Sequence, residues 1–221
     1  AAGVKYEVIG TVTADAAFVV GDVKITMDEA LEAWTSKLEK VFPTKAVKDM
    51  NAVNSDVYKA DSIYVCKKRN AKPTVFIPVF PGTNCEYDNT KAFERAGAKV
   101  TTSVFCDLTA DDIFKSIETM KQKIDECHIF VLSGGFSAGD EPDGSGKFIC
   151  SVLGNKDITE AIHSLLDRGG LVLGICNGFQ ALVKSGLLPY GKLGMVTPDS
   201  PTLFRNDINR HISQMVTTTV A

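Results

Sequence analysis

The sequence predicts an α/β fold: a flavodoxin-like, mainly parallel sheet with helices on both faces, preceded by a small α+β tail. Two observations predict it. From residue 73 onward, apolar runs of strand length alternate with stretches whose apolar residues recur at helical spacing. Residues 1–45 instead combine a hairpin signal with a single helix. We therefore divide the chain into a tail (1–45), a polar connector (46–72) and a main domain (73–221).

The tail is predicted to be a hairpin followed by one helix. Gly21-Asp22 separates two β-branched runs, which is a two-residue hairpin signal. Thr26 and Glu29 have the spacing of a capping box, and Pro43 ends the helical pattern. Between them apolar residues recur at helical spacing, and we expect this stripe to be buried core: Met27, Leu31, Trp34, Leu38 and Val41.

The main domain is predicted to alternate strands with helices. The expected strands are 74–80, 99–105, 128–132 and 171–175. The expected helices are 88–96, one that Thr109 caps, and one that Asp157 and Glu160 cap. The active sites of parallel sheets lie at the carboxyl ends of the strands, so the loops after the first, third and fourth strands point to the site.

The loop after the fourth strand carries Cys176. Gly174 and Gly178 stand two residues to either side of this cysteine, between an apolar strand and a helix-forming stretch. This is the arrangement of a nucleophile elbow with sulfur as the nucleophile. Small neighbours permit the strained turn, and the helix N-terminus favours a thiolate. A buried structural cysteine after a core strand is the plainer interpretation.

The other two loops supply further candidates. Gly134-Gly135 would let backbone N–H groups point inward and, with the N–H of Asn177, form an oxyanion hole beside the thiolate. A plain turn is the alternative for these glycines. Cys85 is a rival nucleophile, but it lacks the strand–elbow–helix context. The histidines offer no convincing base: they are His128, His163 and His211.

Composition and charge exclude several classes of protein. A net charge of −3 gives no bulk attraction to nucleic acid or to a membrane surface. No apolar run approaches the roughly 20 residues of a membrane span, and no signal peptide is apparent. Six scattered cysteines without a Cys-x-x-Cys pair argue against a zinc site and fit a reducing, cytoplasmic setting. Apparent strands at 6–12 and 215–220 suggest a fragment of a longer polypeptide.

Three motifs together resemble the class I glutamine amidotransferase domain of the phosphoribosylformylglycinamidine synthase family. They are Pro-Gly-Thr-Asn-Cys-Glu at 81–86, Gly-Gly-Phe-Ser-Ala-Gly-Asp at 134–140, and Gly-Ile-Cys-Asn-Gly-Phe-Gln at 174–180. The resemblance covers residues 73–221. A weaker one at 38–44 is similar to the end of the family's synthetase portion, which implies the large, fused form of the enzyme.

The resemblance implies a glutaminase chemistry. Cys176 would attack the side-chain amide of glutamine, forming a thioester and releasing ammonia to a synthetase portion of the same polypeptide. The resemblance implies an oxyanion held near Gly135, Phe136 and Asn177. It also implies polar contacts to glutamine from Gly134, Ser137, Gln180 and Asn84. No cofactor or metal is expected within residues 1–221, because ATP and Mg²⁺ would belong to the synthetase portion.

The chain also departs from the family. The family's base and acid lie in a histidine–x–glutamate motif, which is absent here. A cysteine without its base is weakly activated, so we expect little glutaminase activity from this chain alone. Ala138 replaces a more usual tyrosine, and we expect 141–146 to be a mobile loop near the site. Two alternatives stay open: another cysteine-elbow hydrolase, in which histidine often takes the place of Asn177, and a non-catalytic amidotransferase-like module that binds a partner.

Overall fold

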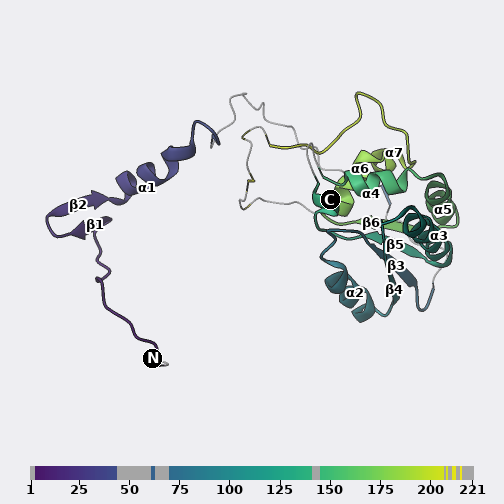
Figure 1. Cartoon of the computed structure of the whole chain (residues 1–221), viewed down its shortest axis with the longest axis horizontal. Helices are drawn as coiled ribbons and strands as arrows, with labels where there is room; N and C mark the ends of the chain where they lie inside the picture. Colours follow the sequence, from purple (N-terminus) through teal and green to yellow (C-terminus); the bar gives the residue numbers. More distant parts are fainter. Residues whose placement is uncertain are drawn as a thin grey trace. The chain divides into compact units, whose positions relative to one another are not determined.

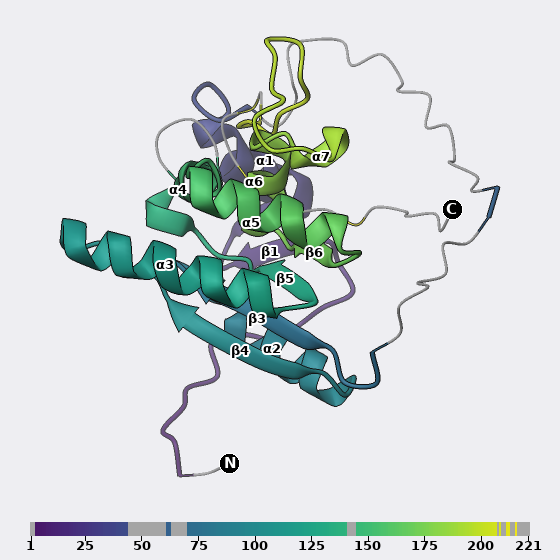
Figure 2. The ribbon, with the colours of Figure 1, turned by 90° about the vertical axis from the view of Figure 1, so that its right-hand side faces the viewer.

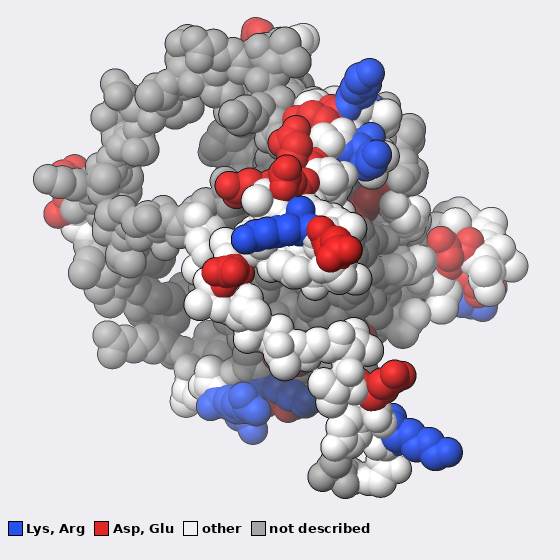
Figure 3. Space-filling model, turned by 90° about the vertical axis from the view of Figure 1, so that its left-hand side faces the viewer, with Lys and Arg blue, Asp and Glu red and all other residues white. Residues whose placement is uncertain are grey.

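The structure, a computed structural model, describes residues 3–43, 61–62, 70–140, 145–206, 208, 211–212 and 215. The chain divides into two compact units, one of residues 1–58 with 206–221 and the other of residues 59–205 (Figure 1). No helix in the described part is long and apolar enough to cross a membrane. The face drawn in Figure 3 carries acidic and basic side chains of the described residues side by side, without a field of one sign.

The first unit contains the predicted hairpin and helix. Its elements are β1 (Ala17–Val20), β2 (Val23–Thr26), α1 (Met27–Thr35) and the 3-10 turn η1 (Ser36–Leu38). The two strands pair antiparallel around Gly21, whose φ is 59°. The capping box is confirmed, because Thr26 Oγ1 accepts from the Glu29 N–H at 3.2 Å and the Glu29 carboxylate accepts from the Thr26 N–H at 2.8 Å.

Two expectations for the tail are wrong. The helical stripe is not core: no residue of α1 is buried, and Trp34 is 80% exposed. A two-stranded hairpin and a nine-residue helix offer too little surface to bury that stripe by themselves. Residues 6–12 form no strand. The expected strand at 215–220 lies outside the described residues, except for Met215.

The second unit has the predicted α/β fold. Its strands are β3 (Thr74–Val79), β4 (Lys99–Val104), β5 (Ile129–Leu132) and β6 (Leu171–Gly174). They form a four-stranded sheet in the order β4-β3-β5-β6, and every pair is parallel. Its helices are α2 (Glu86–Arg95), α3 (Ala110–Glu126), α4 (Lys147–Leu153), α5 (Lys156–Asp167), α6 (Asn177–Lys184) and α7 (Leu187–Tyr190), with the 3-10 turn η2 (Ser137–Gly139).

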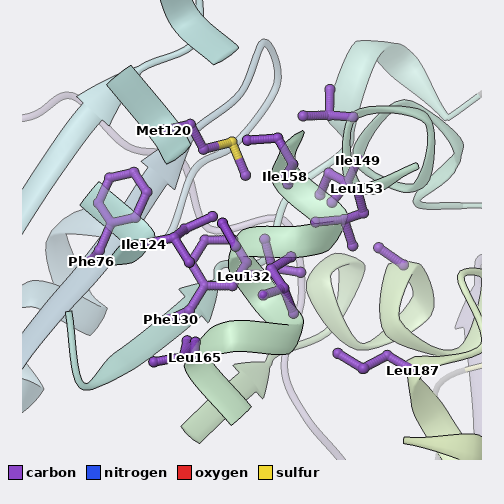
Figure 4. Close-up of a cluster of buried hydrophobic side chains, with 14 of the residues drawn as sticks. Phe76, Met120, Ile124, Phe130, Leu132, Ile149, Leu153, Ile158, Leu165 and Leu187 are labelled. Carbon is purple, nitrogen blue, oxygen red and sulfur yellow. The ribbon is translucent and has the colours of Figure 1, made fainter. Parts of the chain in front are cut away.

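The sheet is covered on both faces, as predicted. Successive strand residues point to opposite faces. Phe76 and Phe130 therefore join the main core with residues of α3, α4, α5, α6 and α7 (Figure 4). Val75, Ile77 and Val131 face the other way and pack near α2, which lies on the opposite side of the sheet from α3 and α5 (Figure 1, Figure 2). The site loops thus leave the carboxyl edge of a sheet whose central strands, β3 and β5, are buried.

The helix starts are partly as predicted. Thr109 caps α3 in a capping box with Asp112, which confirms that boundary. The prediction for α5 is wrong: its N-cap is Asn155, whose Oδ1 accepts from the N–H groups of Asp157 and Ile158. Asp157 lies instead in the first turn, where a carboxylate still favours the helix dipole. The short helix α4 was not expected.

Candidate active site

Cys176 occupies a strained turn between β6 and α6. It is the N-cap residue of α6, with φ 50° and ψ −106°, and its side chain is exposed. Among the described residues, only two others besides glycine have positive φ: Ala138 (49°) and Asp140 (55°), both in the loop after β5. A positive φ costs about 1–3 kcal/mol in a non-glycine residue and tends to mark functional sites. The strained backbone of this unit is therefore gathered at one place.

The flanking glycines make the turn possible. A Cβ atom on Gly178 would clash with the carbonyl oxygen of Leu132 and lie 2.6 Å from its carbonyl carbon. A Cβ atom on Gly174 would lie 2.7 Å from the Gly178 oxygen and 2.6 Å from Leu182 Cδ1. Helix α6 thus starts directly against the end of β5, and only hydrogen fits between them. The predicted role of these two glycines is confirmed.

The loops after β3 and β5 are joined backbone to backbone. The Asn84 N–H donates to the Gly134 oxygen at 3.2 Å, and the Phe136 N–H donates to the Gly82 oxygen at 2.9 Å. Gly135 sits between them with φ 134°, and a Cβ atom there would lie 2.9 Å from the Cα atom of Thr83. Both loops therefore depend on glycine where they touch.

These bonds decide which oxyanion donors remain. The Phe136 N–H is already engaged with Gly82, so in this conformation it is not free to bind an oxyanion. The N–H groups of Gly135 and Asn177 have no acceptor among the residues that the structure describes. They are the two backbone donors, out of the three in the sequence prediction, that the geometry leaves for this role.

A buried polar cluster holds the elbow to the loop after β5. The Asn177 side chain is only 2% exposed, and its Nδ2 donates to Asp140 Oδ2 at 2.8 Å and to Gln180 Oε1 at 3.2 Å. Its Oδ1 accepts from the Ser137 N–H at 3.2 Å. Asp140 Oδ1 in turn accepts from the Gly146 N–H at 2.8 Å and from Ser137 Oγ at 3.3 Å. Asn177 and Asp140 thus tie together α6, the strained loop and the start of α4.

This cluster gives some predicted residues a partner within the protein. Ser137 and Gln180, predicted to contact glutamine, hydrogen-bond to Asp140 and Asn177. Asn84 is exposed, and its Oδ1 accepts from Cys85 Sγ at 3.2 Å. Asp140 was not assigned a role from the sequence, although it ends the second motif. The position of this carboxylate at the end of a glycine-rich motif was the sequence signal that could have indicated its role.

Gly134 lies between the two cysteines of the site. A Cβ atom on Gly134 would be 3.4 Å from Cys176 Cβ and 3.4 Å from Cys85 Sγ. Cys85 itself is half-buried and is the N-cap residue of α2. The structure therefore brings the rival thiol into the same site as the elbow cysteine.

The histidines are engaged elsewhere or lie in the other unit. His128 Nδ1 accepts from the Thr74 N–H at 3.0 Å, and His163 Nε2 accepts from the Leu193 N–H at 3.1 Å. His211 belongs to the first unit. Within the described ranges, no group of three or more His, Cys, Asp or Glu side chains is placed to hold a metal ion. The described part of the site thus consists of Cys176 and nearby backbone N–H donors.

Comparison with known proteins identifies the family of the main domain. A sequence profile described as "CobB/CobQ-like glutamine amidotransferase domain" matches residues 72–221. The chain is 38% identical over 109 residues to phosphoribosylformylglycinamidine synthase subunit PurQ of Dehalococcoides mccartyi, covering 49% of this chain and 38% of that one. It is 41% identical over 117 residues to the same subunit of Helicobacter hepaticus, covering 52% and 44%. The chain thus spans about two-fifths of the length of these curated relatives.

Among solved structures, the chain is similar to the PurLQS structure from Thermotoga maritima. The sequence identity is 31%, and the match covers 53% of this chain and 46% of that one. The TM-score is 0.38.

Proposed function

The chain belongs to the CobB/CobQ-like glutamine amidotransferase family, and from that premise we propose that it is the glutaminase part of a phosphoribosylformylglycinamidine synthase. In this role it hydrolyses glutamine and supplies ammonia for the ATP-dependent amidation of formylglycinamide ribonucleotide in purine biosynthesis. The names of the curated relatives support this substrate. The observation that carries the proposal is the elbow, in which an exposed Cys176 holds a φ of 50° at the start of α6.

The chemistry follows from the groups around Cys176. The thiolate attacks the amide carbon of the glutamine side chain, a C–S bond forms, and the carbonyl electrons move to oxygen. The N–H groups of Gly135 and Asn177 hold that oxyanion. The nitrogen takes up the proton that the thiol released to the base, the carbonyl re-forms, the C–N bond breaks, and ammonia leaves. Water then attacks the thioester, releasing glutamate and the free thiol.

Binding of glutamine involves the loops that flank the elbow. Gly134 lies against Cys176 and leaves room for a substrate carbon, while exposed Asn84 supplies a polar edge. Ser137 and Gln180 act by positioning, since their side chains bond to Asp140 and Asn177. In this assignment the backbone of the loops contacts glutamine, and the side chains of Ser137 and Gln180 hold the loops in place.

The proton acceptor lies outside this chain in the proposal. No histidine–x–glutamate motif occurs in the sequence, and His128 and His163 already accept hydrogen bonds from backbone N–H groups. The chain alone therefore hydrolyses little glutamine. In the proposal, ATP and Mg²⁺ do not bind to this chain either. Both belong to a synthetase portion of the same polypeptide, the large fused form, which receives the ammonia.

The tail supports the fused form through its exposed apolar residues. On α1, Met27, Leu31 and Trp34 are 48%, 54% and 80% exposed. An apolar helix face that is exposed in an isolated unit is expected to pack against another protein surface in the complete protein. In the proposal, that surface is the synthetase portion.

The experiment that tests the function is ammonia release from glutamine by the natural full-length polypeptide. We expect Cys176→Ala to reduce it to background, while added ammonia still supports the ATP-dependent reaction. Cys106→Ser, a change at another exposed cysteine, is the matched control and should keep full activity. If Cys176→Ala uses glutamine as well as the natural protein does, Cys176 is not the nucleophile.

A further inference from the structure

Two cysteines lie beside one glycine in the site. Cys85 Sγ and Cys176 Cβ would each lie 3.4 Å from a Cβ atom on Gly134, so they are separated by no more than twice that distance. Gly134 has no side chain, so no side-chain atom of that residue separates the two cysteines. A disulfide requires the two Cβ atoms to be about 3.5–4.5 Å apart. Rotation of the two side chains brings the sulfurs toward each other but leaves the Cβ atoms in place, so any adjustment of the Cβ separation comes from the loops that carry the two cysteines.

Both thiols are placed where a small oxidant can reach them. Cys176 is exposed and Cys85 is half-buried. They stand at the N-termini of α6 and α2, and neither side chain caps its helix. Cys85 Sγ donates a hydrogen bond to Oδ1 of the exposed Asn84 at 3.2 Å.

The other cysteines that the structure describes have a different setting. Cys127 is buried, and this burial raises the pKa of its thiol to about 11. Burial also raises the pKa of the half-buried Cys150 thiol. Thiols react with oxidants as thiolates, so these two resist oxidation. Cys106 is exposed and provides a comparison within the same unit.

We propose that Cys85 is a resolving cysteine for Cys176. A hydroperoxide first oxidises the Cys176 thiolate to a sulfenic acid, and the alcohol or water from the peroxide leaves. The Cys85 sulfur then attacks the Cys176 sulfur, the S–O bond breaks, and water departs as the disulfide forms. Two thiols are oxidised and one peroxide is reduced. A dithiol reductant then reduces the disulfide and restores both cysteine thiols.

The consequence rests on the proposed function, since only a nucleophilic Cys176 would be silenced by the bond. The disulfide removes the attacking sulfur and also blocks further oxidation of Cys176 to a sulfinic acid, which thiols do not reverse. Glutamine hydrolysis would therefore stop under peroxide and recover once a dithiol reduces the disulfide. Formation of the bond itself depends only on the two thiols.

The test is peptide mapping of the 221-residue chain after exposure to hydrogen peroxide. Trypsin cuts beside Arg69 and Arg168 and should yield peptides 70–91 and 169–184, which carry Cys85 and Cys176 as their only cysteines. Without reduction, we expect the two peptides as one linked species, lighter than their sum by two hydrogen atoms. Dithiothreitol should separate them. This readout is a covalent bond, so it stands even if the protein releases no ammonia from glutamine.

Three variants sharpen the result. In Cys85→Ser the linked species should vanish, and Cys176 should accumulate as sulfinic acid that dithiothreitol does not recover. Gly134→Ala places a methyl group between Cys85 Sγ and Cys176 Cβ, at a position without a positive φ, and should reduce the linked species. Cys106→Ser should leave it unchanged. The proposal is overturned if Cys176 reaches sulfinic acid equally fast with and without Cys85, or if it links to a different cysteine.

Discussion

Replacing Gly178 with alanine tests the packing that creates the elbow. The new Cβ atom would meet three atoms of Leu132: the carbonyl oxygen, the carbonyl carbon at 2.6 Å and Cβ at 2.7 Å. Most of this obstacle is backbone of β5, so no side chain can rotate away. Either α6 or the end of β5 must move.

The magnitude follows from two opposing terms. Forcing a methyl group into a packed interior costs about 1–3 kcal/mol, and a backbone obstacle places this case near the upper end. Alanine in place of glycine within a helix returns about 1 kcal/mol. The net loss in the free energy of unfolding is therefore about 2 kcal/mol. For a unit of this size, that corresponds to a fall in Tm of about 6 °C.

The assay is thermal and urea unfolding of the chain, with Gly154→Ala as the control. Gly154 has φ −73°, and its nearest neighbour for an added Cβ is the Ser151 oxygen at 3.4 Å, an ordinary contact. The control should stay within about 1 kcal/mol of the natural chain. Equal stability of the Gly178 and Gly154 variants would refute the claim that α6 starts against β5 with room only for hydrogen.

Three other changes test separate parts of the structure. Asn177→Ala should lower the free energy of unfolding by about 1–3 kcal/mol, measured in urea, because it removes the acceptor of the buried Ser137 N–H and the donor to Asp140 Oδ2. Thr109→Ala should cost about 1 kcal/mol by removing the cap of α3, whereas Thr109→Ser should cost less. Cys127 has a folded pKa of about 11 against an ordinary value of 9.0, so the folded state keeps its proton longer. Stability should therefore fall as pH rises from about 9 to 11, and more steeply than in Cys127→Ala.

The sheet was predictable because its signals are local. Three of the four strands are short apolar runs, and the helices between successive strands predict a parallel sheet. The order β4-β3-β5-β6 was not predicted, since consecutive β4 and β5 are not neighbours in the sheet. The start of α3 was equally plain, since Thr109 and Asp112 satisfy each other three residues apart. The start of α5 was mistaken because Asn155 and Asp157 are both good capping residues, and sequence alone does not decide between positions two apart.

The tail shows the opposite case. Its hairpin and capping box were predicted from neighbouring residues and are present. Burial of the stripe on α1 was also predicted from spacing, yet Trp34 and Leu31 are exposed. Helical periodicity reports that a helix has an apolar face, but it cannot report which surface covers that face.

The site combines both kinds of information. The glycines around Cys176 predicted the elbow because a tight turn leaves a local trace. The hydrogen bond between Phe136 and Gly82 left none, since it joins loops that are distant in sequence, and it removes one predicted oxyanion donor. The pairing of these loops sets Gly134 against both Cys85 and Cys176. Thus the backbone contacts that shape the site around Cys176 also place a second cysteine beside Gly134, and the proposed glutamine site and the proposed disulfide would use the same glycine-lined space.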